Sequence, residues 1–190
     1  RLAILGEFLA IPAVLTCLLF VFVDMGQPRR VMNVLLHPSP HSVMFWDLIS
    51  LNGYLVLNVL ISRATFRAER DGRAPPAWVK PVVYLSIPWA VSIHTVTAFL
   101  YAGLAARPFW MTAILAPRFL ASAFCSGPAV LLILFQALRR ATGLEIKDEA
   151  IWKVAELMSY AMFFNLFLLG AEMFKEFYSA TEHLLYTRYY

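Results

Sequence analysis

Ionisable side chains stand inside long apolar stretches at several points of this 190-residue sequence. Four of them could take part in proton transfer, namely Asp47, His94, Arg118 and Glu172. Carboxylates and a histidine can accept and release protons, and an arginine can tune the charge around them. If the apolar stretches cross a membrane, each of these groups is costly in hydrocarbon and is therefore a candidate for function.

The composition indicates that the apolar stretches do cross a membrane. Hydrophobic residues make up 61% of the chain and charged residues 15%, with a mean hydropathy of +0.67. Soluble domains average about 45–50% apolar and about 25% charged residues. Too few polar side chains remain to cover a water-facing surface, so we expect a protein embedded in the lipid bilayer.

The charge distribution and the number of cysteines argue against a nucleic-acid-binding protein and against a metal site held by cysteines. The net charge of +4 is spread over the connections between apolar runs, without the basic, aromatic-interleaved stripe of a nucleic-acid-binding protein. Cys17 and Cys125 are the only cysteines, and neither belongs to a CxxC motif. We therefore expect no iron–sulfur cluster and no structural zinc held by this chain alone.

Five stretches reach the roughly 20 apolar residues that a membrane span needs. They cover about residues 2–23, 43–62, 81–104, 112–138 and 150–175. Pro12, Pro88 and Pro128 fall inside spans, which membrane helices tolerate because neighbouring groups satisfy the freed carbonyls. These features predict an all-α fold, an integral membrane helical bundle of about five transmembrane helices forming a single domain over residues 1–190.

The chain starts with Arg1 and enters its first apolar run at Leu2. We therefore expect it to be part of a longer protein.

The distribution of Lys and Arg predicts which side each loop faces. Five lie in 63–80 and three in 139–147, against two at 29–30 and one at 107. By the positive-inside rule the first two connections face the cytoplasm. At about 1.5 Å per residue, Asp47, His94, Arg118 and Glu172 then share the outer half of the membrane, each on a different helix.

Each of these residues also has a purely structural interpretation. Asp47 and Arg118 could form a salt bridge, Glu172 could reach the interface beside Lys175, and His94 could bond a backbone carbonyl. Toward the inner side, Glu7 and Glu156 lie near span ends. Glu156 could form a polar route with Asn165, or could simply extend to the aqueous surface.

A haem-binding function is not expected of this segment. Membrane b-type haem normally needs two axial ligands on facing helices. His94 is the only histidine in a span, because His37 and His41 lie in a loop and His183 lies in the tail.

Several runs of the sequence resemble a known family. Residues 24–30 and 36–47, and above all 87–101, are similar to the NrfD-like, polysulphide-reductase-type membrane subunits. The run 107–129 is similar to the DsrP-type members found in sulfite-reductase-linked complexes. The resemblance covers nearly the whole chain and is most specific over 87–129. Members of this family are longer, which agrees with the expectation of a partial chain.

The resemblance implies a quinone-interacting subunit of a respiratory complex in the cytoplasmic membrane, with multiple membrane passes. Such a subunit would bind menaquinone non-covalently near the outer face, with no metal centre of its own. It would exchange electrons with a ferredoxin-like iron–sulfur subunit docked on that face. In DsrP-type complexes the further partners would be a multihaem cytochrome c and a haem b membrane subunit, linked to sulfite or sulfate respiration.

Quinol oxidation releases two protons, so the site needs groups able to accept them. We predict that His94 and Asp47 are these catalytic acceptors. The predicted quinone-binding residues are Arg118, Tyr54, Asn52, Trp89 and Glu172. Relatives in respiratory complexes can carry an acid shortly after the histidine, where this chain has Phe99, Leu100 and Tyr101.

Two other function classes remain open. A proton or small-solute transporter would also have broken helices and ionisable residues near the midplane, but we find no internal repeat across the five spans. A structural membrane anchor would not need four polar residues at matching depth.

Overall fold

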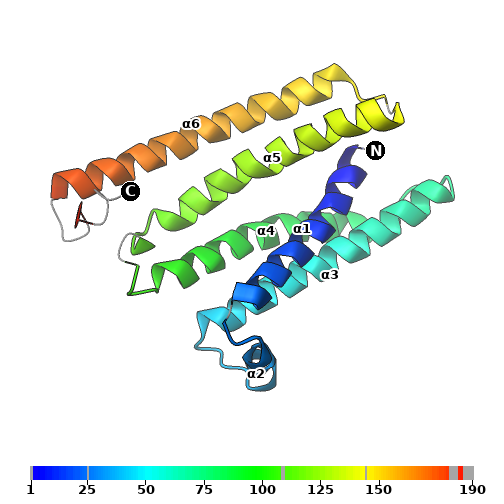
Figure 1. Cartoon of the computed structure of the whole chain (residues 1–190). Coiled ribbons are helices and arrows are strands. Elements are labelled where there is room, and N and C mark those ends of the chain that lie inside the picture. The colour runs from blue at the N-terminus through cyan, green and yellow to red at the C-terminus, as the bar shows by residue number, and fades with distance from the viewer. Residues whose placement is uncertain (1, 25, 108–109, 144, 180–183, 186–190) are drawn as a thin grey trace. The chain divides into compact units, whose positions relative to one another are not determined.

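The computed structural model describes residues 2–24, 26–107, 110–143, 145–179 and 184–185. Within these ranges the chain is helical and contains no strand, which confirms the predicted all-α class. The long helices are α1 (Leu2–Asp24), α3 (Val43–Arg70), α4 (Val79–Ala102), α5 (Leu115–Thr142) and α6 (Asp148–Ser179) (Figure 1). All five are long and apolar enough to cross a membrane, as the apolar runs predicted.

The helix ends differ from the limits of the apolar runs. α3 continues to Arg70, beyond the predicted end of the span at residue 62. Arginine has a high helix propensity, and its long side chain can extend toward water, so the backbone can remain helical beyond the apolar run. The helix ends before Gly72, whose φ of 65° is left-handed.

The connection between α1 and α3 contains two short helical segments that the hydropathy pattern did not predict. They are η1 (Pro28–Arg30) and α2 (Val31–Leu36). Proline at the start of a helical turn has a preset φ and no N–H that needs a partner, which explains where this segment begins.

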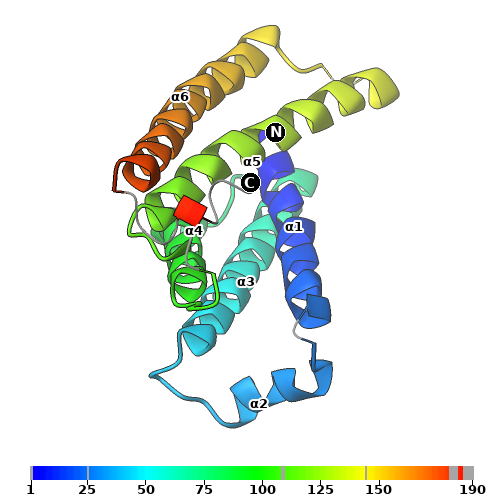
Figure 2. The same ribbon diagram turned by 60° about the vertical axis from the view of Figure 1, so that its left-hand side comes forward.

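The chain divides into two compact units, residues 1–100 and 101–190. In the first unit α1 packs across α3, as Figure 2 shows. Phe8 and Phe66 meet edge to face in this contact, with ring centroids 5.8 Å apart. The single-domain organisation over residues 1–190 stays a prediction.

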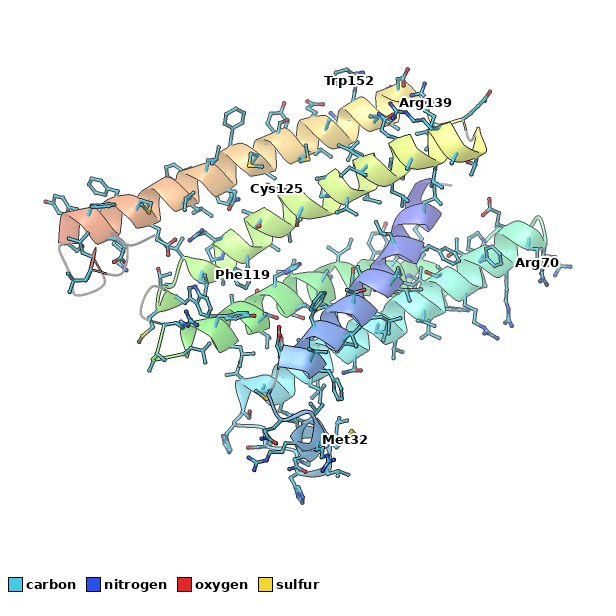
Figure 3. The ribbon with its side chains drawn as sticks, in the orientation of Figure 1. Met32, Arg70, Phe119, Cys125, Arg139 and Trp152 are labelled. Atoms are coloured by element: carbon cyan, nitrogen blue, oxygen red, sulfur yellow. The ribbon has the colours of Figure 1, made fainter. Side chains whose placement is uncertain are left out.

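In the second unit α5 and α6 form a helical hairpin. Gly143 ends α5 in the left-handed conformation that commonly terminates helices. Arg139 near the end of α5 pairs with Asp148 at the start of α6, which closes the turn. Trp152 projects from α6 away from α5 and is 73% exposed, as expected of a side chain facing lipid (Figure 3).

Candidate functional site

Asp47 lies just over one turn inside α3 and is buried, with 7% of its surface exposed. Its Oδ1 accepts a hydrogen bond of 2.7 Å from the Thr97 hydroxyl on α4. A buried carboxylate is stable only when it is hydrogen-bonded or paired. The neutral threonine supplies one bond and leaves the charge of the carboxylate uncompensated, so Asp47 retains the capacity to accept a proton.

Trp89 anchors the same part of α4 to α3. Its indole N–H donates to the backbone carbonyl of Ser50 at 2.9 Å. The ring covers Gly53 so closely that a Cβ there would lie 2.4 Å from Trp89 Cζ2. Glycine at position 53 therefore allows the aromatic ring to lie against the α3 backbone, which fixes how α4 meets α3 beside Asp47.

His94 is half-buried on α4, three residues before Thr97. Residues at this spacing lie on the same side of a helix, about 4.5 Å apart along the axis. The imidazole therefore lies near the threonine that binds Asp47. Within the described part of the first unit, neither ring nitrogen of His94 forms a hydrogen bond.

The two other predicted lining residues of α3 occupy different faces. Tyr54 is half-buried and lies two turns after Asp47, on the same face. Asn52 is exposed, and its side chain donates to the Leu48 carbonyl at 2.8 Å. Its participation in a quinone site stays a prediction.

In the second unit, Arg118 of α5 forms a salt bridge with Glu172 of α6. Glu172 is only 1% exposed, whereas the Arg118 side chain is 24% exposed. Glu172 is therefore a buried residue of the helix interface and not a surface group at the membrane boundary. Among the described residues its Oε1 has no hydrogen-bond partner.

The four ionisable residues thus form part of two local arrangements, one in each unit. The observed partner of Arg118 is Glu172, and that of Asp47 is Thr97. The salt bridge between Asp47 and Arg118 stays an untested alternative. That all four line one site stays a prediction.

Aromatic rings gather at the start of the second unit. Tyr101 packs edge to face on Trp110, with centroids 5.1 Å apart, and also meets Phe119 at 5.8 Å. The Arg107 guanidinium lies 5.5 Å from the centre of the Trp110 ring, in cation–π contact. This aromatic group lies at the predicted outer end of α5.

Glu156, which the sequence offers for an inner polar route with Asn165, has hydrogen-bond partners on its own helix. On an exposed face of α6 it accepts hydrogen bonds from Lys153 at 2.8 Å and Tyr160 at 3.0 Å. This local cluster favours the alternative in which the charged side chains extend to the aqueous surface.

Sequence reasoning missed three residues of the first unit, Thr97, Ser50 and Gly53. The spacing of Thr97 from His94 was a usable signal, because a hydroxyl three residues away shares its helix face. The roles of Ser50 and Gly53 depend on where the Trp89 side chain packs, and no local sequence pattern predicts that position. Within the described residues, no group of three histidine, cysteine or acidic side chains is placed to hold a metal ion.

Comparison with known proteins identifies the family. The family model "Polysulphide reductase, NrfD" matches residues 1–188. One relative, which belongs to the selenate reductase of Mesobacillus selenatarsenatis, is 24% identical, with 96% of this chain and 50% of that protein covered. Another, from a putative dimethyl sulfoxide reductase of Halobacterium salinarum, is a membrane protein 26% identical over 88% of this chain and 42% of its own length.

A third relative is the Hdr-like menaquinol oxidoreductase integral membrane subunit of Archaeoglobus fulgidus. It is 21% identical, with 94% of this chain and 44% of that protein covered. No solved structure matches the chain significantly. The chain spans about half the length of these curated relatives. Because the family model covers almost every residue, the chain belongs to the NrfD polysulphide reductase family.

Proposed function

We propose that this chain is the quinone-binding part of a membrane subunit of a respiratory oxidoreductase. In this proposal, menaquinol gives its electrons to an iron–sulfur subunit docked on the outer face, in a pathway that reduces sulfur compounds. The observation that carries the proposal is the buried Asp47–Thr97 hydrogen bond with His94 one turn away on α4. The family membership and the menaquinol oxidoreductase name of the Archaeoglobus relative support the choice of ligand.

The residues around Asp47 fit the head group of a quinone. Such a head group is a flat apolar ring with two oxygen atoms, so it needs polar partners and an apolar or aromatic wall. His94 offers ring nitrogens, Asp47 a carboxylate, and Trp89 an aromatic surface held in place by its bond to Ser50. A bound quinol supplies two electrons and two protons, and the protein supplies orientation and proton acceptors.

The chain's own part in the reaction is to hold and accept protons. A neutral His94 accepts a hydrogen bond through one ring nitrogen and takes a proton at that atom. The Thr97 hydroxyl orients Asp47 through Oδ1, which leaves lone pairs on the carboxylate for a second proton.

In the proposal, electrons pass from the quinol to a centre in the iron–sulfur partner. The two cysteines are too few to ligate an iron–sulfur cluster, which normally takes four. We place the docking of the iron–sulfur partner at the predicted outer end, where Trp110 and Arg107 form an aromatic and cationic group. A multihaem cytochrome c and a haem b membrane subunit complete the proposed complex.

In the second unit, the proposal gives the Arg118–Glu172 pair a role in charge balance. Glu172 balances the charge of Arg118 through Oε2. Its Oε1 has no hydrogen-bond partner among the described residues and can accept one. This arrangement would offer a hydrogen-bond acceptor without adding a net charge.

Substitution His94→Leu in the purified complex tests the function. We expect quinol-dependent reduction of the iron–sulfur partner to fall by about 100-fold or more, because a general base is removed, while the complex still assembles. His41→Leu is the matched control, since His41 is exposed in the α2–α3 connection. Quinol oxidation at the wild-type rate in His94→Leu would exclude the proposed site.

A further inference from the structure

Three arginines form a row on one face of α3, at the end of the helix that lies farthest from Asp47. They are Arg63, Arg67 and Arg70, and all three are exposed. Spacings of four and three residues place them on the same side of the helix, one above another. We call them the arginine row, and Figure 3 labels the last member, Arg70, at the end of α3.

α3 is longer than the hydrocarbon core of a bilayer. Its 28 residues extend about 42 Å at about 1.5 Å per residue, whereas the core is about 30 Å thick. At least one end of a spanning α3 must therefore project beyond the core. The apolar run that predicts the span ends at residue 62, directly before the row. On that prediction the arginine row lies at the depth of the lipid head groups.

The direction of α3 turns these side chains back toward the membrane. Side chains on an α-helix lean toward its N-terminus. α3 runs from Asp47 toward Arg70, so Arg67 and Arg70 lean toward Arg63 and the apolar part of the helix. The three guanidinium groups can therefore meet near one level, although their Cα atoms are spread over about 10 Å of helix.

Little within the chain balances the charge of the arginine row. Arg70 Nε lies 3.8 Å from Asp71 Oδ1, and exposed pairs of this kind contribute little. Among the described residues, neither Arg63 nor Arg67 has an ion-pair partner. Glu69 is the other acidic residue of this segment, and its spacing from the three arginines puts it on a different face of α3.

Exposed aromatic rings flank the row. Phe66 is 51% exposed, and its ring meets Phe8 of α1 edge to face. Trp78, one residue before α4, is 47% exposed, and tryptophan is enriched where lipid head groups meet the hydrocarbon. Apolar rings beside cations fit a ligand that has acyl chains as well as negative charge. A lipid has both, whereas a soluble acidic partner lacks the acyl chains.

We propose that the arginine row binds the head group of an anionic phospholipid, for which phosphatidylglycerol is the test ligand. Guanidinium groups bind phosphate oxygens through two parallel N–H bonds, and basic clusters beside a membrane helix attract anionic lipids. Arg73 and Lys80 add two cations in the same connection. By the positive-inside rule this lipid belongs to the cytoplasmic leaflet.

The positive-inside rule alone does not account for the row. That rule depends on how many Lys and Arg residues a connection carries, and it does not require three arginines to share one helix face. None of the residues of the proposed quinone site belongs to the row, so the lipid site and the quinone site are tested separately.

The test measures which lipids stay with the purified protein and the subunits that accompany it. The sample is equilibrated with equal amounts of phosphatidylglycerol and phosphatidylcholine in detergent and separated from free lipid, and the retained lipids are counted by mass spectrometry. We expect the wild type to retain phosphatidylglycerol preferentially, and less of it at high salt. Arg63→Gln with Arg67→Gln should retain it at least about tenfold more weakly, because each basic residue near an anionic surface strengthens the attraction about fivefold.

The matched control is Arg140→Gln with Lys147→Gln, which removes the same charge from the other connection predicted to face the cytoplasm. Both residues are exposed, and neither belongs to the arginine row. The control should retain phosphatidylglycerol as the wild type does. The single variants Arg63→Gln and Arg67→Gln, each expected to weaken retention about fivefold, carry the test if the double variant fails to assemble.

Wild-type retention of phosphatidylglycerol in the assembled arginine variants would overturn the lipid site. An equal loss in the control pair would also overturn it, since the net charge and not the row would then hold the lipid. Equal retention of the two lipids by the wild type would exclude a site for an anionic head group. Binding of inorganic phosphate without retention of phosphatidylglycerol would assign the row to free phosphate and not to a lipid.

Discussion

The two units bury a carboxylate in opposite ways. In the first unit, Asp47 is held by the neutral hydroxyl of Thr97, and in the second, Glu172 is held by the cationic Arg118. An ion pair in a low-dielectric interior is strongly coupled, so losing one member leaves the other uncompensated. A carboxylate with a neutral partner stays available for a proton. The comparison supports the proposal that Asp47 in the first unit takes part in proton transfer, whereas Glu172 in the second unit carries a charge that Arg118 balances.

Removing the acid of the ion pair should have the largest effect on stability. Glu172→Leu leaves Arg118 without its partner in the α5–α6 interface, and we expect a loss of about 3–5 kcal/mol in the free energy of unfolding. Thermal or denaturant unfolding of the purified protein in detergent measures it. The double variant Arg118→Met with Glu172→Leu should recover most of the loss. A double variant as unstable as the single one would show that the loss does not come from an uncompensated charge.

Adding a methyl group at Gly53, where α3 meets α4, should have an intermediate effect on stability. Gly53→Ala puts a Cβ against the Trp89 ring, so the ring must move and its bond to Ser50 is strained. We expect a loss of about 1–3 kcal/mol in unfolding free energy, together with weaker quinone binding. Gly170→Ala is the control, because a Cβ there meets nothing within 4 Å and alanine favours the helix. Equal stability of the two variants would remove the packing role assigned to Gly53.

Removing the neutral partner of Asp47 should have the smallest effect on stability. Thr97→Val deletes one hydrogen bond while keeping the side-chain shape, and we expect a loss of about 1–2 kcal/mol in unfolding free energy. Quinol oxidation should fall more than stability, because Asp47 loses its orientation, and Thr97→Ser should restore both. A Thr97→Val protein as destabilised as Glu172→Leu would contradict the contrast between the units.

The fold followed from the sequence more fully than the site did. Apolar runs define membrane helices directly, because only a helix satisfies every backbone group within one segment. The short α2 helix and the extension of α3 to Arg70 lie outside the predicted apolar runs, so the hydropathy pattern carries little information about them.

The candidate residues could be predicted from the cost of charge in hydrocarbon, but their partners could not. Asp47 has Thr97 as its partner because α3 and α4 meet through Trp89 and Gly53, and this depends on side-chain packing. For Glu172 the sequence left open a position at the membrane interface beside Lys175, whereas the structure buries it between α5 and α6. The burial of Ser50, Asn58 and Ser62 on α3 could not be predicted, because serine and asparagine residues scattered among apolar ones change a hydropathy profile little.

The central claim is that Asp47 and His94 belong to a quinone site. The most direct measurement is the menaquinone that can be extracted from the purified complex, compared among wild type, Asp47→Asn, His94→Leu and the His41→Leu control. We expect bound quinone in the wild type and the control, and its loss in the Asp47 and His94 variants. Wild-type quinone content in both of these variants would contradict the assignment.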